Sequence, residues 1–342
     1  MSPLPSYPAI LTKLIGGGVL ARADAAALME QIMAGALTTA QIAAVAVALR
    51  LRGETAGEIA GLADAMRRHA VAVPDPPPDC VDTCGTGGDG LRTFNISTLA
   101  ALVAAGAGVT VAKHGNRAAT SRAGSADLLE ALGLQLELAP AREAQALHTL
   151  GIAFLFARAH HPALKHAAAA RDELGVRTVF NMLGPLTNPA GAQIQLMGVF
   201  PGIALDMVAT VLHELGSVRA LVVRGQDGMD EITLVGPTDV AELRDGTIRR
   251  YTLTPEELGL TRCRADDLFG GSADENAAIA RAILDGVAGP RADIVALNAG
   301  AVIYLAGRAA TIKDGIAIAR HALHSGAARA KLERLIAFYA AP

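Results

Sequence analysis

The chain has 342 residues, a net charge of −3, 51% hydrophobic residues and 18% charged residues. This composition is typical of a compact globular protein of about two domains and excludes a disordered one. The charge argues against general attraction to nucleic acid or membranes, which need a basic field. No apolar run is long enough to span a membrane, and the three cysteines fit a reducing cytoplasm.

The first 70 residues predict helices only. Helical spacing covers residues 23–33, and Thr38 or Thr39 can cap a second helix over 40–51. Thr55 and Glu58 fit a capping box that opens a third helix, running to residue 69. The proline-rich run 73–79 then stiffens the chain. We therefore expect a small helical domain over residues 1–72 and a large domain over 73–342, with helices near 162–185 joining the small one.

From residue 80 strands and helices alternate. The pattern predicts strands at 80–84, 109–112, 134–138, 152–156, 193–200 and 218–223. Between them it predicts helices at 97–105, 125–132 and 162–174, and two more opened by Pro140 and Pro201. Such βαβ repeats imply an α/β fold with a mainly parallel sheet and helices on both faces.

The last third of the chain shows a different pattern of predicted elements. Residues 240–243 and 247–253 predict a hairpin around Asp245-Gly246, and 274–339 a series of helices.

A glycine-rich run, Gly85-Thr86-Gly87-Gly88-Asp89-Gly90, follows the first predicted strand. It satisfies the dinucleotide-binding string, but residues 91–95 still intervene before the helix, and Lys113 follows the next strand where that fold needs an acid. Glycine turns place successive N–H groups around an anion, and the helix N-terminus near Asn95 and Ser97 adds more donors. The run therefore predicts a phosphate cradle of another kind.

A second polar loop, residues 113–127, follows the next strand. Lys113 and Arg117 offer positive charge for an anion, and Ser125 can cap the following helix. Two neighbouring anion-binding loops predict a ligand with two phosphate groups.

An acidic pair, Asp230-Glu231, follows the strand at 218–223. Two carboxylates repel a pyrophosphate directly but can anchor it through Mg²⁺, which prefers oxygen ligands. We therefore expect Mg²⁺ as the cofactor.

Two further features remain open on sequence alone. Arg171 has the planar guanidinium that matches a substrate carboxylate, although it also has Glu173 as a neighbour. His160 and His161 suggest a metal, but consecutive residues point in different directions, which favours a capping or substrate-wall role.

Together these motifs resemble the anthranilate phosphoribosyltransferases, in order and over nearly the whole chain. The matches are Gly85-Thr86-Gly87-Gly88-Asp89, Asn95-Ile96-Ser97-Thr98, Lys113-His114-Gly115-Asn116-Arg117, 124–133, His160-His161-Pro162-Ala163, 171–178, 181–189 and Asp230-Glu231. One departure is Ala169-Ala170 before Arg171, where such proteins usually carry Pro-Val; both versions are small and apolar.

The resemblance implies transfer of the 5-phosphoribosyl group from phosphoribosyl pyrophosphate (PRPP) to anthranilate in tryptophan synthesis, by a fold like that of the nucleoside phosphorylases. It also implies a cytoplasmic homodimer formed through the helical domain, with no nucleic-acid or membrane partner. Metal ligands would be Ser97, Asp230 and Glu231, and anthranilate contacts Gly85, Asn116 and Arg171. No general base is implied; Arg171 and Asn116 would position the amine. PRPP would be held by Gly85, Gly88, Asp89, Thr93, Asn95, Ile96, Ser97, Thr98, Lys113, His114, Gly115, Asn116, Arg117, Ala118, Ala119, Thr120, Ser121 and Ser125.

Two alternatives belong to other functional classes. A pyrimidine nucleoside phosphorylase would share the fold but bind free phosphate and a nucleoside, without needing the acidic pair. A non-catalytic nucleic-acid binder on the same scaffold would need a basic surface, which a net charge of −3 does not offer.

Overall fold

The computed structural model describes residues 6–118 and 122–341. Its N-terminal part is helical: α1 (Tyr7–Ile15), α2 (Arg22–Met33), α3 (Thr39–Arg52) and α4 (Ala56–Arg68). Thr38 caps α3 and Thr55 caps α4, each in a capping box with the residue three positions on. The capping signals in the sequence are therefore confirmed, and the helices begin where the sequence predicts.

A seven-stranded sheet forms the centre of the larger part. Its order is β3-β2-β1-β4-β5-β6-β7. The first five strands in this order run parallel, and β6 and β7 are antiparallel. The strands are β1 (Val81–Gly85), β2 (Val111–Gly115), β3 (Ile152–Phe156), β4 (Ile194–Gly198), β5 (Arg219–Gly225), β6 (Thr238–Arg244) and β7 (Thr247–Leu253). The mainly parallel sheet and the hairpin are both confirmed.

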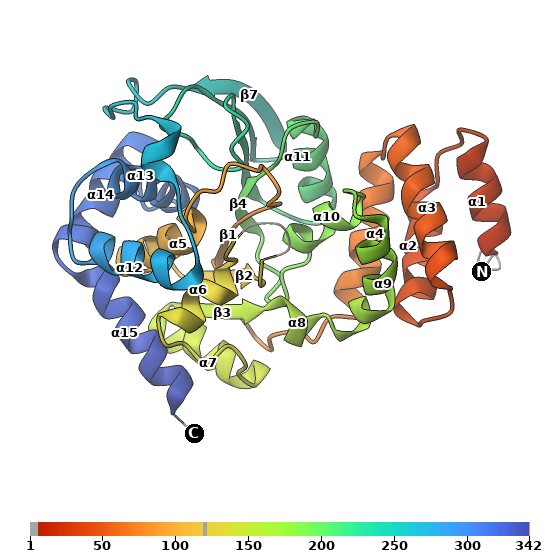
Figure 1. The fold of residues 1–342 in the computed structure, drawn as a ribbon, viewed down its shortest axis with the longest axis horizontal. Coiled ribbons are helices and arrows are strands. Elements are labelled where there is room, and N and C mark those ends of the chain that lie inside the picture. Colours follow the sequence, from red (N-terminus) through yellow and green to blue (C-terminus); the bar gives the residue numbers. More distant parts are fainter. Residues whose placement is uncertain (1–5, 119–121, 342) are drawn as a thin grey trace.

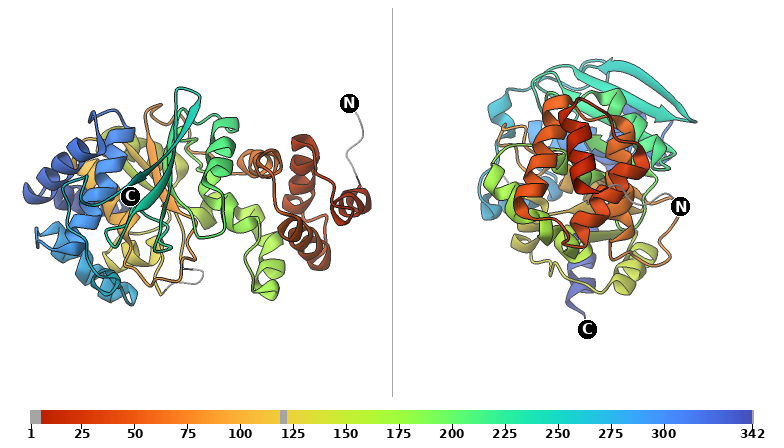
Figure 2. Two further views of the ribbon diagram at one scale, coloured as in Figure 1. Left: turned by 90° about the horizontal axis from the view of Figure 1, so that it is seen from above. Right: turned by 90° about the vertical axis from the view of Figure 1, so that its right-hand side faces the viewer.

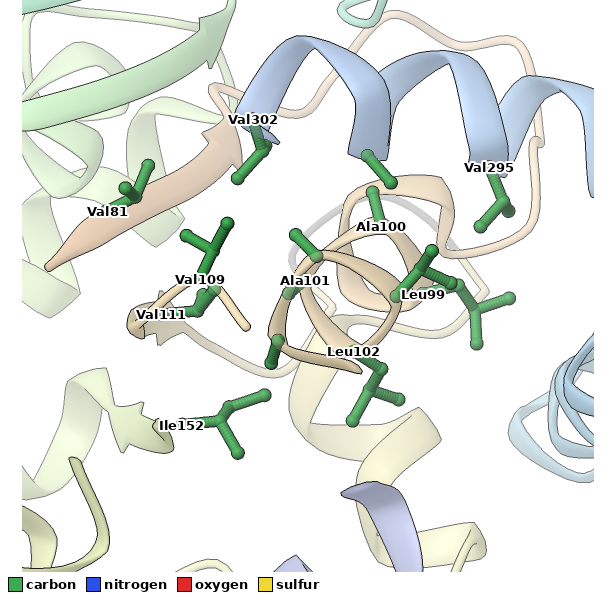
Figure 3. Close-up of a cluster of buried hydrophobic side chains, with 14 of the residues drawn as sticks. Val81, Leu99, Ala100, Ala101, Leu102, Val109, Val111, Ile152, Val295 and Val302 are labelled. Atoms are coloured by element: carbon green, nitrogen blue, oxygen red, sulfur yellow. The ribbon is translucent and has the colours of Figure 1, made fainter. Parts of the chain in front are cut away.

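Helices cover both faces of this sheet (Figure 1). The face that carries Val81 and Val111 packs on α5 (Ile96–Gly106), which is apolar on all sides and buried between the strands and α13 (Figure 3). Beyond α5 lie the C-terminal helices. They are α12 (Ala273–Leu284), α13 (Pro290–Leu305), α14 (Ile312–His324) and α15 (Ala327–Ala340), with α6 (Ser125–Ala131) and α7 (Pro140–Leu150) beside them.

The opposite face of the sheet is continuous with the helical part. Met197 and Val222 on that face pack with α11 (Leu205–Glu214), and the same buried cluster extends into α2, α3 and α4. α9 (Lys165–Leu174) packs against α3 and α2, and α10 (Phe180–Leu183) against α4. Figure 2 shows the N-terminal helices beside the sheet domain, with α9 next to them. The short elements α8 (Ala157–His160), Pro162–Leu164, Gly184–Leu186 and Ala265–Leu268 complete the chain.

Two sequence predictions are wrong in detail. Residues 134–138 form no strand: Leu134 and Leu136 are buried and Gln135 and Glu137 exposed, so the alternation reflects one-sided burial of an extended connector without strand pairing. The helix expected to open at Pro201 begins at Leu205, after a turn. No helix among the described residues is long and apolar enough to cross a membrane.

Candidate active site

The candidate site lies at the edge of the sheet where four neighbouring parallel strands end. β1, β2, β4 and β5 end at Gly85, Gly115, Gly198 and Gly225. Open α/β sheets bind ligands outside these carboxyl ends. A Cβ on Gly198 would lie 1.5 Å from the main-chain oxygen of Asp230, and one on Gly85 would lie 2.2 Å from its Oδ2. The missing side chains therefore make room for the acidic segment.

The loop after β1 has the backbone that its glycines predict. Gly87, Gly88 and Gly90 have φ values of 65°, 77° and 78°, which residues with a side chain rarely adopt. Thr86 ties the loop to the end of β4, because its N–H donates to the Gly198 carbonyl (2.9 Å) and its Oγ1 accepts from the Phe200 N–H (3.0 Å). The glycine loop is therefore held in place over the strand ends.

The acidic pair lies against this loop and against the start of α5. The Gly87 N–H donates to Oδ2 of Asp230 (2.7 Å), and the Ser97 N–H donates to Oε1 of Glu231 (3.1 Å). Asn298 of α13 fixes the next residue, since its amide bonds both the N–H and the carbonyl of Ile232 (3.0 Å each). Two N–H donors that the sequence assigned to a phosphate cradle thus hold carboxylates. The structure brings Asp230 next to the glycine loop and Glu231 next to Ser97.

The carboxyl groups of Asp230 and Glu231 lie close enough to each other and to Asp89 to affect one another's charge. Burial, with the charge of Asp89, raises the pKa of Asp230 to about 7, and burial with Asp230 raises that of Glu231 to about 8. Oδ2 of Asp89 is buried without a hydrogen-bond partner. Among the described residues no group of three or more histidine, cysteine, aspartate or glutamate side chains is arranged to hold a metal. Mg²⁺ commonly binds through one or two carboxylates plus substrate phosphates, and Asp230 with Glu231 fits that pattern.

Lys113 brings a buried positive charge beneath the same loop. Its Nζ donates to the Thr83 carbonyl (2.7 Å) and lies 3.5 Å from Oγ of Ser97. Burial lowers the pKa of Lys113, and the charges of Asp82, Cys84 and Glu231 oppose that shift. Asp82, fully buried in β1, also accepts the His114 N–H at Oδ1 (3.1 Å). Lys113 is thus held at the strand end, close to the start of α5.

The second loop folds onto α6. Asp127 accepts the N–H groups of Ala118 (2.9 Å) and Gly124 (2.8 Å) and pairs with Arg117 (2.9 Å), which also contacts Glu130. The charge of Arg117, expected to face an anion, is therefore balanced by carboxylates. Ser125 is not the cap: α6 is preceded by Gly124, and Oγ of Ser125 donates to the Asn116 carbonyl (3.2 Å). Ala119, Thr120 and Ser121 lie outside the described residues.

Arg171 lies half-buried on α9, where burial lowers the pKa of its guanidinium. The segment after α9 reaches the glycine loop: Arg177 stacks over the Phe200 ring (4.4 Å), and a Cβ on Gly88 would lie 3.0 Å from its guanidinium. A cavity of about 30 Å³ adjoins this contact and is also lined by Arg50 and Glu54 of the helical part. The helical part therefore borders the site.

The two consecutive histidines point in different directions, as expected. His160 contacts the Val71 carbonyl through Nδ1 (2.6 Å) and Glu143 through Nε2 (3.0 Å). The His161 ring lies 5.2 Å from that of His114, between ring centres, and its Nε2 contacts the Thr187 carbonyl (3.1 Å). Only His161 is next to a residue of the second loop.

Several residues of this site were given no role by the sequence motifs. Asp82, Arg177 and Asn298 support the strand ends, the glycine loop and the acidic segment, as described above. Asp82 lies three residues before Gly85, and a charged residue inside a predicted strand was a usable signal for it. Asn298 lies in a long apolar helix and could not be connected to Ile232 without the fold.

Comparison with known proteins agrees with this geometry. Residues 77–329 match the family model described as glycosyl transferase family, a/b domain, and residues 8–70 match the helical bundle domain of the same family. A curated anthranilate phosphoribosyltransferase of Moorella thermoacetica is 53% identical over 328 residues, which are 96% of this chain and 97% of that protein. The chain belongs to the anthranilate phosphoribosyltransferase family.

Solved members of the anthranilate phosphoribosyltransferase family have the same fold. The Thermus thermophilus enzyme superimposes with a TM-score of 0.92 at 52% identity, covering 97% of this chain and 99% of that one. The Saccharomyces cerevisiae enzyme in complex with PRPP and Mg gives 0.90 at 28% identity, covering 97% of both chains. Membership in this family favours the transferase over the phosphorylase and the nucleic-acid binder.

Proposed function

We propose that the chain transfers the 5-phosphoribosyl group of PRPP to the amine of anthranilate, giving N-(5-phosphoribosyl)anthranilate and pyrophosphate in tryptophan biosynthesis. The observation that carries this proposal is the acidic pair, half-buried Asp230 and buried Glu231, set against the glycine loop and the start of α5. A family member at 28% identity is solved with PRPP and Mg, and a structure of the same yeast enzyme contains 4-fluoroanthranilate.

In this proposal the two strand-end loops hold PRPP. The glycine loop and the start of α5 supply N–H donors, and Lys113 supplies positive charge from below. Asp230, Glu231 and Ser97 would hold Mg²⁺, which when bound neutralises charge on the departing pyrophosphate. The PRPP-binding residues are those that the resemblance implies, from Gly85 to Ser125.

The reaction needs positioning more than proton transfer. Positive charge develops at C1 of the ribose as pyrophosphate leaves, and the amine of anthranilate is neutral at pH 7, so no strong general base is required. Arg171 would hold the carboxylate of anthranilate and Asn116 would orient the ring, which converts an encounter into an aligned pair. Stabilisation of the departing negative charge by fixed N–H groups and Lys113 supplies the electrostatic part of catalysis.

The assembly and location follow the same proposal. The unit boundary falls at residues 72/73, with α9 and α10 belonging to the helical unit. Ile15, Val19 and Leu51 of that unit are 73%, 49% and 82% exposed, which supports a homodimer formed through it. Three free cysteines support a cytoplasmic location.

The test follows the native fluorescence of anthranilate as it is consumed. The purified chain is mixed with anthranilate, PRPP and Mg²⁺, and each component is omitted in turn. We expect fluorescence to fall only when all are present, with one pyrophosphate released per anthranilate lost. No loss in the complete mixture would overturn the proposed reaction.

A further inference from the structure

Asn95 stands at the start of α5 but does not cap it. No side-chain cap bond forms there. Its side chain instead crosses between the two loops: Nδ2 donates to the Ala123 carbonyl (3.0 Å), and Oδ1 accepts from Nδ2 of Asn276 (2.9 Å). The end of the glycine loop is thereby linked to the second loop through one amide.

Asn276 comes from α12, 181 residues later in the chain. It is 3% exposed, and its Oδ1 accepts the Gly271 N–H (2.8 Å). The segment before α12 packs directly on the first loop, because the Phe94 N–H donates to the Leu268 carbonyl (3.2 Å) and the Gly270 N–H to the Arg92 carbonyl (2.9 Å). Asn276 is thus fixed at both of its amide atoms beside the site.

The side-chain amides of Asn276 and Asn95 can be oriented in only one way in this series of hydrogen bonds. A main-chain N–H requires Oδ1 of Asn276 as its acceptor, which turns Nδ2 of Asn276 toward Asn95. Asn95 must then present Oδ1, which leaves its Nδ2 for the Ala123 carbonyl. The series begins at the main-chain donor of Gly271 and ends at the main-chain acceptor of Ala123, so every amide orientation is determined.

We propose that Asn276 is a positioning residue for PRPP. It touches no substrate; it sets the orientation of Asn95 and so the separation of the two loops that PRPP must bridge. This inference rests on the proposed function. Because a ligand binds better to loops already at the right separation, loss of the amide series should weaken PRPP binding and leave anthranilate binding unchanged.

Asn276→Asp tests the proposal with almost no change in shape. The carboxylate still accepts the Gly271 N–H but donates nothing, so Asn95 must turn its NH₂ toward residue 276 and its Oδ1 toward the Ala123 carbonyl, where two acceptors repel. We expect the KM for PRPP to rise about tenfold, the effect of one buried hydrogen bond, and the KM for anthranilate at saturating PRPP to stay unchanged. Asn276→Ser, smaller and uncharged, should behave in the same way if the aspartate variant does not fold.

Ser272→Ala is the matched control. Ser272 caps the same helix, its Oγ accepting from the Glu275 N–H (3.3 Å), and it is exposed. Its removal should lower the Tm without changing the KM for PRPP. An unchanged KM for PRPP in the Asn276 variants, or an equal rise for both substrates, overturns the positioning role. Asn95→Ala distinguishes failure of this inference from failure of the proposed PRPP site. If Asn95→Ala raises the KM for PRPP and the Asn276 variants do not, only this inference fails. If Asn95→Ala has no effect, the result counts against the proposed PRPP site.

Discussion

At the scale of single residues, the acidic pair and the cradle are bonded to each other. The N–H groups of Gly87 and Ser97 meet carboxylates from a segment more than 130 positions away. In the proposed function these donors would bind pyrophosphate and these carboxylates would bind Mg²⁺, and their mutual hydrogen bonds keep both sets oriented. Preorganised polar groups of this kind need little rearrangement when charge develops.

Replacing Asp230 and Glu231 with amides should reduce turnover without preventing the chain from folding. For Asp230→Asn combined with Glu231→Gln we expect Mg²⁺-dependent turnover to fall by at least about a hundredfold, the size of a lost electrostatic contact in an active site. The raised pKa values of the two acids mean that their ionised forms cost stability as pH rises from about 4 to about 8. The neutral amides should therefore hold or raise the Tm at pH 8.

The control for this double variant is Asp245→Asn, on the exposed hairpin turn. Turnover and Tm should both stay close to those of the original chain. Full turnover in the double variant would remove the metal assignment.

Arg171 offers a test of the anthranilate side. Arg171→Ala should raise the KM for anthranilate about tenfold to a hundredfold, since a hydrogen bond to a charged group contributes about 1.5–3 kcal/mol, and should leave the KM for PRPP unchanged. Steady-state kinetics with each substrate varied in turn measures both. Lys165→Ala, at an exposed position of the same helix, should change neither. An unaltered KM for anthranilate would place the carboxylate elsewhere.

At the scale of elements, signals that act within a few residues predicted most of the local structure correctly. Contacts between distant segments could not be predicted from the sequence. Thr38, one of two candidate caps, and Thr55, with its capping box, begin helices as predicted, whereas Ser125 does not cap α6. Gly87 and Gly88 take the positive φ that a cradle needs. Both signals act within a few residues of themselves. The alternation at 134–138 wrongly predicted a strand, because burial on one side of any extended segment gives the same alternation as a strand.

The candidate site divides in the same way. Its loops were predictable because they follow strands and carry glycine, lysine and acidic residues together. Asn276 and Asn298 were not, because a lone amide inside an apolar helix shows no partner until the chain folds. The pairing of Arg117 with Asp127 and Glu130 also depends on how the second loop turns back onto α6.

Within the helical part, Glu58 connects α3, α4 and the segment that precedes α2. It is fully buried and accepts the Leu20 N–H (2.8 Å), pairs with Arg52 and closes the capping box of α4. Burial alone would raise the pKa of Glu58, but the bonds from Arg52 and the main chain lower it below its ordinary value. This carboxylate is therefore ionised and fully paired.

Its removal should be costly. Glu58→Ala removes the carboxylate that balances Arg52 and leaves the buried Leu20 N–H without its acceptor. We expect the free energy of unfolding to fall by about 3–5 kcal/mol, as for other broken buried pairs. Denaturant unfolding measures it. Glu30→Ala removes surface pairs with Arg68 and His69 in the same domain and should cost about 1 kcal/mol. Equal losses in the two variants would contradict a special role for Glu58.

At the scale of the whole molecule, two apolar cores meet at the sheet. One face of the sheet belongs to the core with α5 and the C-terminal helices, and the other continues into the helical part. Buried histidines lie where these bodies meet the second loop. Burial, and then the charge of His160, lowers the pKa of His161 to about 4, and burial also lowers that of His114.

These histidines predict a loss of stability in mild acid. A histidine with a lowered pKa binds fewer protons in the folded than in the unfolded chain, so its contribution is complete above pH 6.5 and is lost as pH falls toward 4. For His161 the full loss is about 3 kcal/mol. His160 has a raised pKa and acts in the opposite sense, losing its contribution as pH rises.

His161→Gln keeps a donor for the Thr187 carbonyl but cannot titrate. Tm measured from about pH 7 to about pH 4.5 should fall less steeply in this variant than in the original chain. His324→Gln, at an exposed position of α14, controls for the substitution itself. Parallel curves for all three proteins would show that His161 does not set the acid limit.

The ties around residue 71 have a mechanical consequence. The connector is bonded to α8 in both directions, Val71 N–H to the His160 carbonyl (2.8 Å) and His160 Nδ1 to the Val71 carbonyl, and the Val73 N–H donates to the Pro189 carbonyl (3.0 Å). Three segments at the junction of the two bodies are thus hydrogen-bonded to one another: the connector at residues 71–73, α8 and the segment at Pro189. These hydrogen bonds fix the spacing of the two bodies at this junction, so we expect any change in their relative position to leave the junction intact.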